Sequence, residues 1–373
     1  MDRSQRCNAS AQRGTFRRLP TIWCGATVRA VQPGDPPASG TREMKTYLSG
    51  IQPSGLQHIG NYFGAIRQHV LGQENEGEHF YFIADYHSLT TSRDPEDLRT
   101  QVRETALTYL SLGLDPERSV LFRQSDVPEV TEIAWFLASV TGMGLLERAH
   151  SYKDKIAHGV KPNVGLFTYP ILMAADILAY DSNVVPVGKD QVQHVEMAQD
   201  MAGHFNTIYG DTFVRPESQM PEDDRHAKVL GLDGEKMSKS YGNDLWIFES
   251  GKKLKKAIGR IATDSRAPEE PKNPDELLLF HFLELFLGAE GAGDLGEWRE
   301  RVQRGGEGAP GYGHLKQRLI ESIDTLFGPA RERREELLAR PDEVDQILAA
   351  GAEKARKRAQ SVRDRALAAC GLR

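Results

Sequence analysis

The segment SGIQPSGLQHIGNYFGAI, residues 49–66, has the pattern of a turn between a strand and a helix. The residues before it, TYLSGIQ, favour a strand, whereas Ile59, Phe63 and Ile66 repeat at the spacing of one helical face. In an α/β protein such a turn lies at the carboxyl end of a strand. Ligands bind there, against the free N–H groups at the start of the following helix. The sequence therefore predicts a ligand-binding βα unit at this position.

Length and composition indicate a globular protein with more than one domain. The chain has 373 residues and 39% hydrophobic content, enough to bury a full core, and this length favours two domains. The cysteines Cys7, Cys24 and Cys370 have no metal-ligand spacing, so we expect neither a disulfide framework nor a metal site, and a reducing compartment fits. No apolar run approaches the roughly 18 residues of a membrane span. The net charge of −6 argues against wholesale coating of nucleic acid but allows local basic patches.

Residues 1–43 differ in composition from the rest of the chain. They hold seven arginines, no lysine and three acidic residues, and they end in a segment rich in proline and glycine. Periodic sequence begins at Met44. We therefore expect residues 1–43 to be a disordered or non-native N-terminal extension, with an organellar transit peptide as the alternative.

From Met44 onward strand and helix patterns alternate. Strands are predicted at 79–85, 119–124 and 183–187, and helices at 94–113, 129–140, 168–180 and 191–205. This alternation predicts a doubly wound, Rossmann-like parallel sheet in a first domain, residues 44–240. Beyond about residue 245 the strand patterns fade. Residues 241–373 are therefore expected to form a second, all-helical domain, and we allow for its last helix packing back on the first domain.

A second polar segment, GEKMSKSYGN at residues 234–243, places Lys236 and Lys239 beside serines and glycines. A flexible cationic loop of this kind can hold a polyphosphate and stabilise charge that develops on it. The spacing is not that of a Walker loop. By composition alone, a lysine-containing surface loop is the alternative.

A third group of polar residues lies around Asp176. Tyr169, Met173 and Asp176 fall on one face of a predicted helix, and the carboxylate has apolar sequence neighbours, so it must find a donor in the protein or in a ligand. Gln191 and His194 share the inward face of the next helix. A ligand site and a carboxylate satisfied by the fold itself both remain open at this point.

Taken together, these segments resemble a known family. PSGLQHIGN and KMSKS resemble the two signature motifs of class I aminoacyl-tRNA synthetases. SGIQPSG, TYPILMAADILAY, VPVGKDQVQHVE and AIGRIATDS narrow the resemblance to the bacterial-type tryptophanyl-tRNA synthetase family, because they follow its order and spacing. The resemblance covers about residues 44–373.

The resemblance implies a two-step reaction. The carboxylate of L-tryptophan attacks the α-phosphate of ATP to give tryptophanyl adenylate and pyrophosphate, and the acyl group then passes to the terminal adenosine of tRNA(Trp). No side chain is a covalent nucleophile in this chemistry, so catalysis consists of alignment and charge stabilisation.

The resemblance also assigns roles to residues of this chain. The implied ATP site comprises Gln52, Pro53, Ser54, Gly60 and Asn61, Gly188, Lys189 and Asp190 near the ribose, Val229 near adenine, and Lys236, Met237, Ser238, Lys239 and Ser240. The implied catalytic contacts to the polyphosphate come from Lys236, Lys239 and Lys155, with Mg²⁺ bridging its oxygens. The implied tryptophan pocket comprises Asp176, Tyr169, Met173, Gln191, His87, Val185 and Val187.

Some positions depart from the family pattern. The first motif ends in Asn61 where many class I enzymes have a second histidine, and His58 stands where the family often has threonine, so His58 receives no catalytic role. Leu48 stands where some relatives have an aromatic residue near the indole. Lys189 is often acidic in relatives, so we expect a ribose contact there from the backbone.

By resemblance, the helical domain recognises the anticodon of tRNA. Its candidate surfaces are two basic runs, Lys252, Lys253, Lys255, Lys256 and Arg260, and Lys354, Arg356, Lys357, Arg358, Arg363 and Arg365. Such runs are also common on solvated helix faces. A cytoplasmic homodimer is implied in the same way, and the lack of a long apolar run predicts no membrane contact. Two alternatives remain, a tyrosyl-tRNA synthetase and a small-molecule adenylyltransferase or paralogue that does not charge tRNA.

Overall fold

The computed structural model describes residues 44–149, 161, 163–220, 229–289 and 294–373. The expected extension, residues 1–43, and Lys155 lie outside the described residues.

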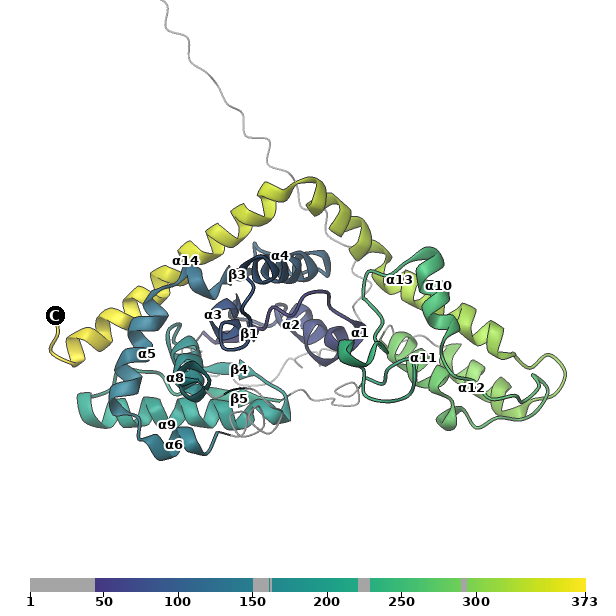
Figure 1. Cartoon of the computed structure of the whole chain (residues 1–373), viewed down its shortest axis with the longest axis horizontal. Coiled ribbons are helices and arrows are strands. Elements are labelled where there is room, and N and C mark those ends of the chain that lie inside the picture. The colour runs from purple at the N-terminus through teal and green to yellow at the C-terminus, as the bar shows by residue number, and fades with distance from the viewer. Residues whose placement is uncertain (1–43, 150–160, 162, 221–228, 290–293) are drawn as a thin grey trace, which may run out of the picture.

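A sheet of five parallel strands forms the centre of the first domain, in the order β3-β2-β1-β4-β5 (Figure 1). The order of the strands reverses between β1 and β4, which leaves a crevice at their carboxyl ends. The predicted doubly wound sheet is therefore confirmed. The strands are β1 (Thr46–Ile51), β2 (Glu78–Ile83), β3 (Ser119–Arg123), β4 (Val184–Pro186) and β5 (Glu217–Gln219).

Helices and short turns connect these strands, most of them where the sequence predicts helices. Pro95 opens α4 and the Asp94 side chain caps it by accepting from the N–H groups of Glu96 and Asp97. The helix expected from residue 168 begins earlier, because the Asn163 side chain caps it at the N–H of Leu166. The elements are α1 (Ile59–Asn61), η1 (Tyr62–Ile66), α2 (Arg67–Gly72), α3 (Asp85–Ser88), α4 (Pro95–Ser111), η2 (Gln124–Asp126), α5 (Glu129–Val140), α6 (Met143–Glu147), α8 (Val164–Leu178), η3 (Lys189–Gln191) and α9 (Val192–Tyr209).

The described part of the chain after residue 245 is helical, as expected. In Figure 1 α10, α11 and α12 gather around α13, away from the sheet, and α14 returns toward it. Pro341 opens α14 directly after Arg340, whose non-helical backbone ends α13. The elements after residue 245 are α10 (Gly251–Gly259), η5 (Pro274–Glu276), α11 (Leu278–Ala289), α12 (Asp294–Arg304), α13 (Tyr312–Ala339) and α14 (Pro341–Ala369); η4 (Lys239–Tyr241) precedes them.

Two apolar clusters lie on opposite faces of the sheet. On β1 and β2 the side chains alternate, so that Ile51 and Tyr81 belong to one cluster and Leu48 and Phe80 to the other. The first cluster continues through α1 and η1 into the helical region. The second cluster is formed with α5, α8 and α9. The first motif is therefore packed directly against the helical region.

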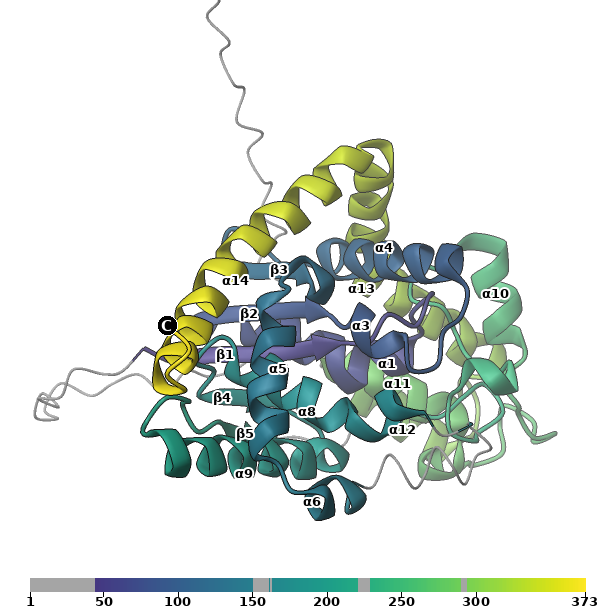
Figure 2. The same ribbon diagram turned by 60° about the vertical axis from the view of Figure 1, so that its left-hand side comes forward.

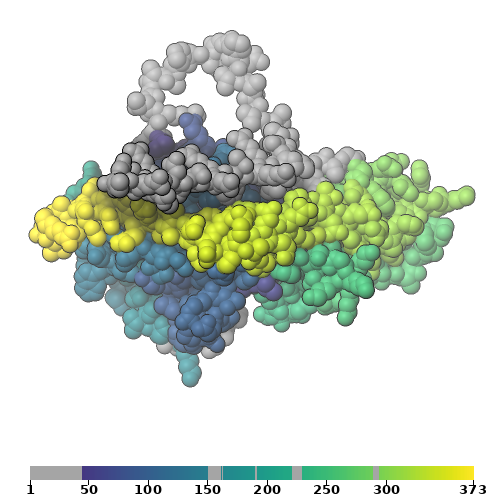
Figure 3. Space-filling view, turned by 90° about the horizontal axis from the view of Figure 1, so that it is seen from above, coloured from purple at the N-terminus to yellow at the C-terminus, as the bar shows by residue number. Residues whose placement is uncertain are grey.

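The last helix, α14, passes around the edge of the sheet at β3. Its first half contributes Val344 and Leu348 to the first cluster, and its second half contributes Ala355 and Ala359 to the second. At the crossing point Gly351 touches the edge strand, where a Cβ atom would lie 2.0 Å from the carbonyl oxygen of Leu121. Figures 2 and 3 show α14 in yellow along this side of the molecule. The helix thus covers a strand edge that would otherwise be open to pairing.

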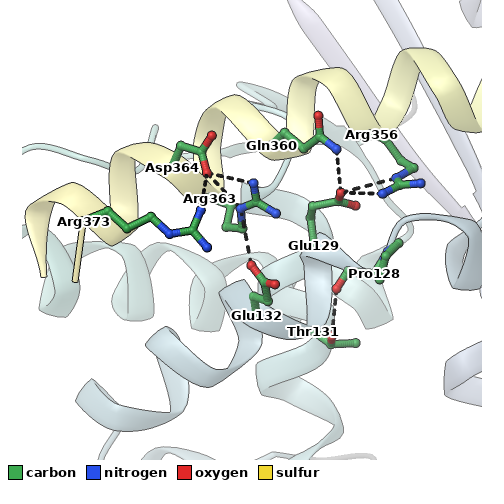
Figure 4. A network of polar contacts seen from close by, with 9 residues as sticks. All are labelled: Pro128, Glu129, Thr131, Glu132, Arg356, Gln360, Arg363, Asp364 and Arg373. Carbon is green, nitrogen blue, oxygen red and sulfur yellow. Dashed lines mark hydrogen bonds and ion pairs between the residues drawn. The ribbon is translucent and has the colours of Figure 1, made fainter.

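Ion pairs hold the second half of α14 to the first domain. Figure 4 shows the Glu129 carboxylate on α5 accepting from Arg356 at 3.1 Å and from Gln360 at 2.8 Å. Burial alone would raise the pKa of Glu129, but these hydrogen bonds outweigh burial and hold it below its ordinary value. Further pairs join Arg358 to Glu78, Arg363 to Glu132 and Arg365 to Asp181. The basic run expected to face tRNA is therefore largely engaged within the chain, because four of its arginines have acidic partners on the first domain.

Replacing Gly351 tests the crossing of α14 over β3. We expect Gly351→Ala to lower the free energy of unfolding by about 1–3 kcal/mol, because the new Cβ overpacks a backbone contact that cannot relax. Gly203→Ala, on an exposed face of α9 with no atom within 4 Å of the new Cβ, is the matched control. Gly203→Ala should raise the free energy of unfolding by about 0.5–1 kcal/mol, because alanine favours the helix more than glycine does. Urea denaturation measures both changes, and equal effects would contradict the proposed close contact.

Candidate active site

The first motif forms a capped turn at the carboxyl end of β1. His58 Nδ1 accepts from the N–H of Asn61 at 3.3 Å, and Asn61 Oδ1 accepts from the N–H of His58 at 3.0 Å. This capping box requires a neutral imidazole. Burial, and then the charge of Lys239, lower the pKa of His58, against an opposing effect of Asp244. His58 therefore has a structural task at the start of α1.

The preceding residues are shaped by a buried glutamine. Gln57 Nε2 donates to the Ser54 hydroxyl and to the Gly55 carbonyl, each at 3.2 Å. Gly55 has φ +74°, which favours glycine. Of the expected ATP ligands in this turn, Pro53 is buried, whereas Gln52 and Ser54 are exposed at the carboxyl end of β1.

The second motif lies directly against the first, although about 180 residues separate them in the sequence. The Lys239 ammonium donates to the backbone carbonyl of Ser54. Met237 is buried, and its sulfur lies 3.6 Å from the place that a Cβ on Gly60 would occupy. Burial lowers the pKa of Lys239, opposed by the charge of Asp244. The buried Val229 accepts from the N–H of Met237 at 3.2 Å, while Lys236 and Ser240 are exposed. The two segments assigned to ATP therefore form one surface.

Asn243 organises the loop of the second motif, a role that the sequence analysis missed. Its Oδ1 accepts from the N–H of Ser238 at 2.8 Å, and its Nδ2 donates to Asp233 at 2.9 Å and to the Lys236 carbonyl at 3.2 Å. Gly231 leaves space for this amide, because a Cβ there would lie 2.4 Å from it.

Asp176 forms the centre of the second half of the site. The carboxylate, on α8, is 1% exposed and accepts from His87 Nε2 at 2.8 Å and from Gln124 Nε2 at 2.8 Å to each oxygen. The amide of Gln124 can have only this orientation, because its oxygen accepts from the N–H of Tyr86 at 3.1 Å. The pKa of Asp176 is raised, mainly by burial and to a smaller extent by the charge of Asp85. The hydrogen bonds from His87 and Gln124 lower it but do not outweigh burial.

Gln124 and Asp85 were not among the expected site residues. Asp85 accepts from the N–H groups of Tyr86 at 2.9 Å and Ser125 at 3.0 Å, and from the Ser125 hydroxyl. It thereby joins α3, which carries His87, to η2, which carries Gln124. A signal existed, because Asp85 and Gln124 lie at the carboxyl ends of β2 and β3, where α/β proteins bind ligands.

The remaining expected pocket residues lie on α8, β4 and α9. Gln191 accepts from His194 Nδ1 at 2.7 Å, so His194 Nε2 accepts from the Tyr169 hydroxyl at 3.0 Å. Met173, Val185 and Val187 belong to the second apolar cluster or pack against it. Gly188 and Lys189 are exposed at the carboxyl end of β4, and the side chain of Asp190 lies outside the described residues.

Metal clusters and membrane spans are both absent from the described part of the chain. No group of three or more His, Cys, Asp or Glu side chains there could hold a metal ion. None of the described helices is both long and apolar enough to span a membrane.

Comparisons with known proteins agree with this geometry. Residues 41–328 match the family model of tRNA synthetases class I (W and Y). The chain is 53% identical to the tryptophan–tRNA ligase of Rhodopirellula baltica, over 87% of this chain and 99% of the relative. It is similar to the crystal structure of tryptophanyl-tRNA synthetase from Campylobacter jejuni complexed with ADP and tryptophan. The TM-score is 0.79 and the identity 48%, over 88% of this chain and 100% of that one.

Exchanging the two partners at the buried carboxylate tests its hydrogen bonds. In Asp176→Asn the new amide N–H₂ faces a hydrogen-bond donor, and in Gln124→Glu a second carboxylate faces the first. Each single substitution should therefore lower the free energy of unfolding by about 1–3 kcal/mol. In the double variant the carboxylate introduced at position 124 accepts from the amide introduced at position 176, and the oxygen of that amide still accepts from His87. We expect a favourable coupling of about 0.5–3 kcal/mol in a double-mutant cycle measured by urea denaturation. Purely additive costs would mean that Gln124 and Asp176 do not interact as described.

Proposed function

The chain belongs to the tryptophanyl-tRNA synthetase family of class I, and on this premise we propose how its site attaches L-tryptophan to tRNA(Trp). Its activity is that of a tryptophan–tRNA ligase. The observation that carries the substrate assignment is the buried Asp176 carboxylate. An ionised carboxylate offers about four lone-pair positions, and His87 and Gln124 take three, so one acceptor position is left for the indole N–H.

The tryptophan side chain is proposed to lie between α8, β4 and α9. Asp176 accepts the indole N–H, while Met173, Val185 and Val187 supply apolar contacts. The ring nitrogen of His194 holds the Tyr169 hydroxyl, so that Tyr169 and Gln191 face the substrate in fixed orientations. A pocket of this kind rejects phenylalanine, because phenylalanine has no N–H to donate and the buried Asp176 carboxylate would lose that hydrogen bond.

ATP is proposed to bind across the two motifs. Gln52, Pro53, Ser54, Gly60 and Asn61 form the floor, with Gly188, Lys189 and Asp190 at the ribose and Val229 at adenine. When the tryptophan carboxylate attacks the α-phosphate, negative charge moves to the departing pyrophosphate. Lys236 and Lys239 stabilise that charge, and the serines Ser238 and Ser240 donate beside them. Lys155 is kept in this role from the sequence resemblance alone, and Met237 fixes the loop by its burial.

Mg²⁺ belongs to the proposal as a partner of the nucleotide. The described residues offer no carboxylate cluster for it, which fits an ion whose oxygen ligands come mainly from phosphates. Such an ion neutralises charge on the triphosphate.

We propose residues 44–240 as the catalytic domain and 241–373 as the domain that recognises the anticodon. Four exposed lysines on α10 form no ion pair among the described residues, and they are the better candidates for phosphate contacts: Lys252, Lys253, Lys255 and Lys256.

A homodimer in the cytoplasm completes the proposal. Exposed apolar side chains on α5, α6 and the start of α8 support it, because Trp135, Met143 and Val164 are 74%, 62% and 78% exposed. Sedimentation of the full chain should give twice the monomer mass.

Pyrophosphate exchange with individual amino acids, followed by charging of tRNA(Trp), tests the function. We expect exchange with tryptophan and none comparable with tyrosine or phenylalanine. Asp176→Ala should sharply reduce tryptophan activation and narrow its preference over phenylalanine toward the about 1–3 kcal/mol that shape alone supplies. Exchange with tyrosine would favour the sister family, and exchange without tRNA charging would favour an adenylyltransferase.

We expect Lys236 and Lys239 to affect the rate of adenylate formation more than the ATP dissociation constant. Lys236→Ala and Lys239→Ala are each expected to slow adenylate formation by about 10²-fold, because each removes one electrostatic donor to the transition state. Rapid-quench kinetics measures this rate separately from the ATP dissociation constant. Lys253→Ala on α10 is the control and should leave both unchanged. A raised ATP dissociation constant at an unchanged rate would assign the loop to simple binding.

A further inference from the structure

The segment that follows the second motif, residues 245–249, is paired with the backbone of the first motif. The N–H of Ile59 donates to the Leu245 carbonyl at 2.9 Å, and the N–H of Ile247 donates to the Gln57 carbonyl at 3.1 Å. Between these bonds His58 and Trp246 form an antiparallel bridge. A displacement of residues 245–249 would therefore move the backbone at which the capped turn of the first motif ends and α1 begins.

Two arginines on α13 hold the other side of this segment. The guanidinium of Arg334 lies 4.9 Å from the ring centroid of Phe248 and 5.6 Å from that of Trp246. Arg331 donates to the Glu249 carbonyl at 2.6 Å. The two arginines are three residues apart on a helix, so they lie on one face of α13. The helical region thus holds residues 246–249 by two ring contacts and one hydrogen bond.

Arg334 is a buried charge with specific compensation. The residue is 7% exposed, and its Nη2 donates to Glu104 on α4 at 2.7 Å. Its Nη1 has no hydrogen-bond partner among the described residues, so the two aromatic faces supply the remaining stabilisation of the cation. The guanidinium therefore joins three parts of the molecule, namely α13, α4 and the segment paired with the first motif.

Aromatic packing at the same place keeps α13 close to the first motif. Phe327 on α13 meets Tyr62 edge to face at 4.9 Å between ring centroids, and Phe286 on α11 meets Phe63 at 5.3 Å. Tyr62 and Phe63 follow Asn61 directly, at the start of η1. The first motif is thus held by the helical region on both of its sides.

We propose that Arg334 is a positioning residue for the nucleotide half of the site. It fixes residues 245–249 against α13 and α4, and through them it fixes the capped turn around His58. The inference rests on the proposed binding of ATP by that turn. Its effect is confined to the nucleotide, because Phe248 and Ile59 belong to the first apolar cluster, whereas the α8 residues around Asp176 belong to the second.

The test separates the two halves of the site. In Arg334→Gln we expect the rate constant for adenylate formation divided by the ATP dissociation constant to fall about tenfold to a hundredfold, the usual cost of slight misplacement of reacting groups. The tryptophan dissociation constant, measured by calorimetry without ATP, should change less than about twofold. Arg334→Lys should give a smaller loss, because it keeps the charge opposite Glu104 without the flat face that covers the two rings.

Arg318→Gln is the matched control. Arg318 lies on the same helix and holds Asp294 with two hydrogen bonds, at 2.9 Å and 2.7 Å, within the helical region. Its loss should lower the melting temperature while leaving the ATP parameters within about twofold.

Two outcomes would overturn the proposal: an equal loss of tryptophan and ATP binding in Arg334→Gln, or ATP parameters no worse than in Arg318→Gln. If Arg334→Gln does not fold, Phe248→Leu removes a ring face at nearly constant apolar volume and must show the same loss for ATP alone. Failure of the unsubstituted chain to exchange pyrophosphate with tryptophan would instead refute the proposed function, which the Arg334 variants do not test.

Discussion

Both halves of the site depend on the parallel pairing of β1 with β2 on one side and with β4 on the other. Tyr47 pairs with His79 on β2 and with Val184 on β4, and the order of the strands reverses between β1 and β4. The crevice between them receives the capped turn after β1 and the turn after β4. A parallel sheet buried on both faces also creates two separate cores. The two signature motifs pack on one core, and Asp176 with its α8 neighbours lies in the other.

What the sequence predicts well is local. The cap at Asp94, the period of the helices and the run of buried strands depend on neighbours within a few residues. The demand of Asp176 for a donor was equally visible, because a carboxylate among apolar neighbours needs one. Its donors were harder to foresee, since Gln124 and His87 lie 52 and 89 residues away and come together through the sheet. The strand β5 shows no strand pattern in the sequence, because its three residues, Glu217–Gln219, are polar and all exposed.

The partners of the basic segments could not be predicted from the sequence either. A run of arginines and lysines reveals neither its partners nor its exposure, and the basic runs of α14 and α10 carry the same sign of charge. In the structure the α14 arginines lie opposite scattered acids, Glu78, Glu129, Glu132 and Asp181. The planar guanidinium suits such fixed ion pairs, whereas the flexible ammonium groups of α10 stay hydrated at the surface. Residue type therefore carried information that net charge alone did not.

A reaction without a covalent nucleophile puts unusual weight on this division into two cores. In the proposed site tryptophan lies against the second cluster, and the two motifs that would hold the ATP phosphates lie against the first. The attacking carboxylate and the α-phosphate would then meet only if the two cores keep their relative position. The backbone of β1 belongs to both, since Leu48 faces one cluster and Ile51 the other. In the proposed site, alternation along this single strand therefore sets the distance between the two reactants. A disturbance within one core should leave the affinity for the other reactant nearly intact while the rate of their reaction falls, because alignment supplies much of the catalysis.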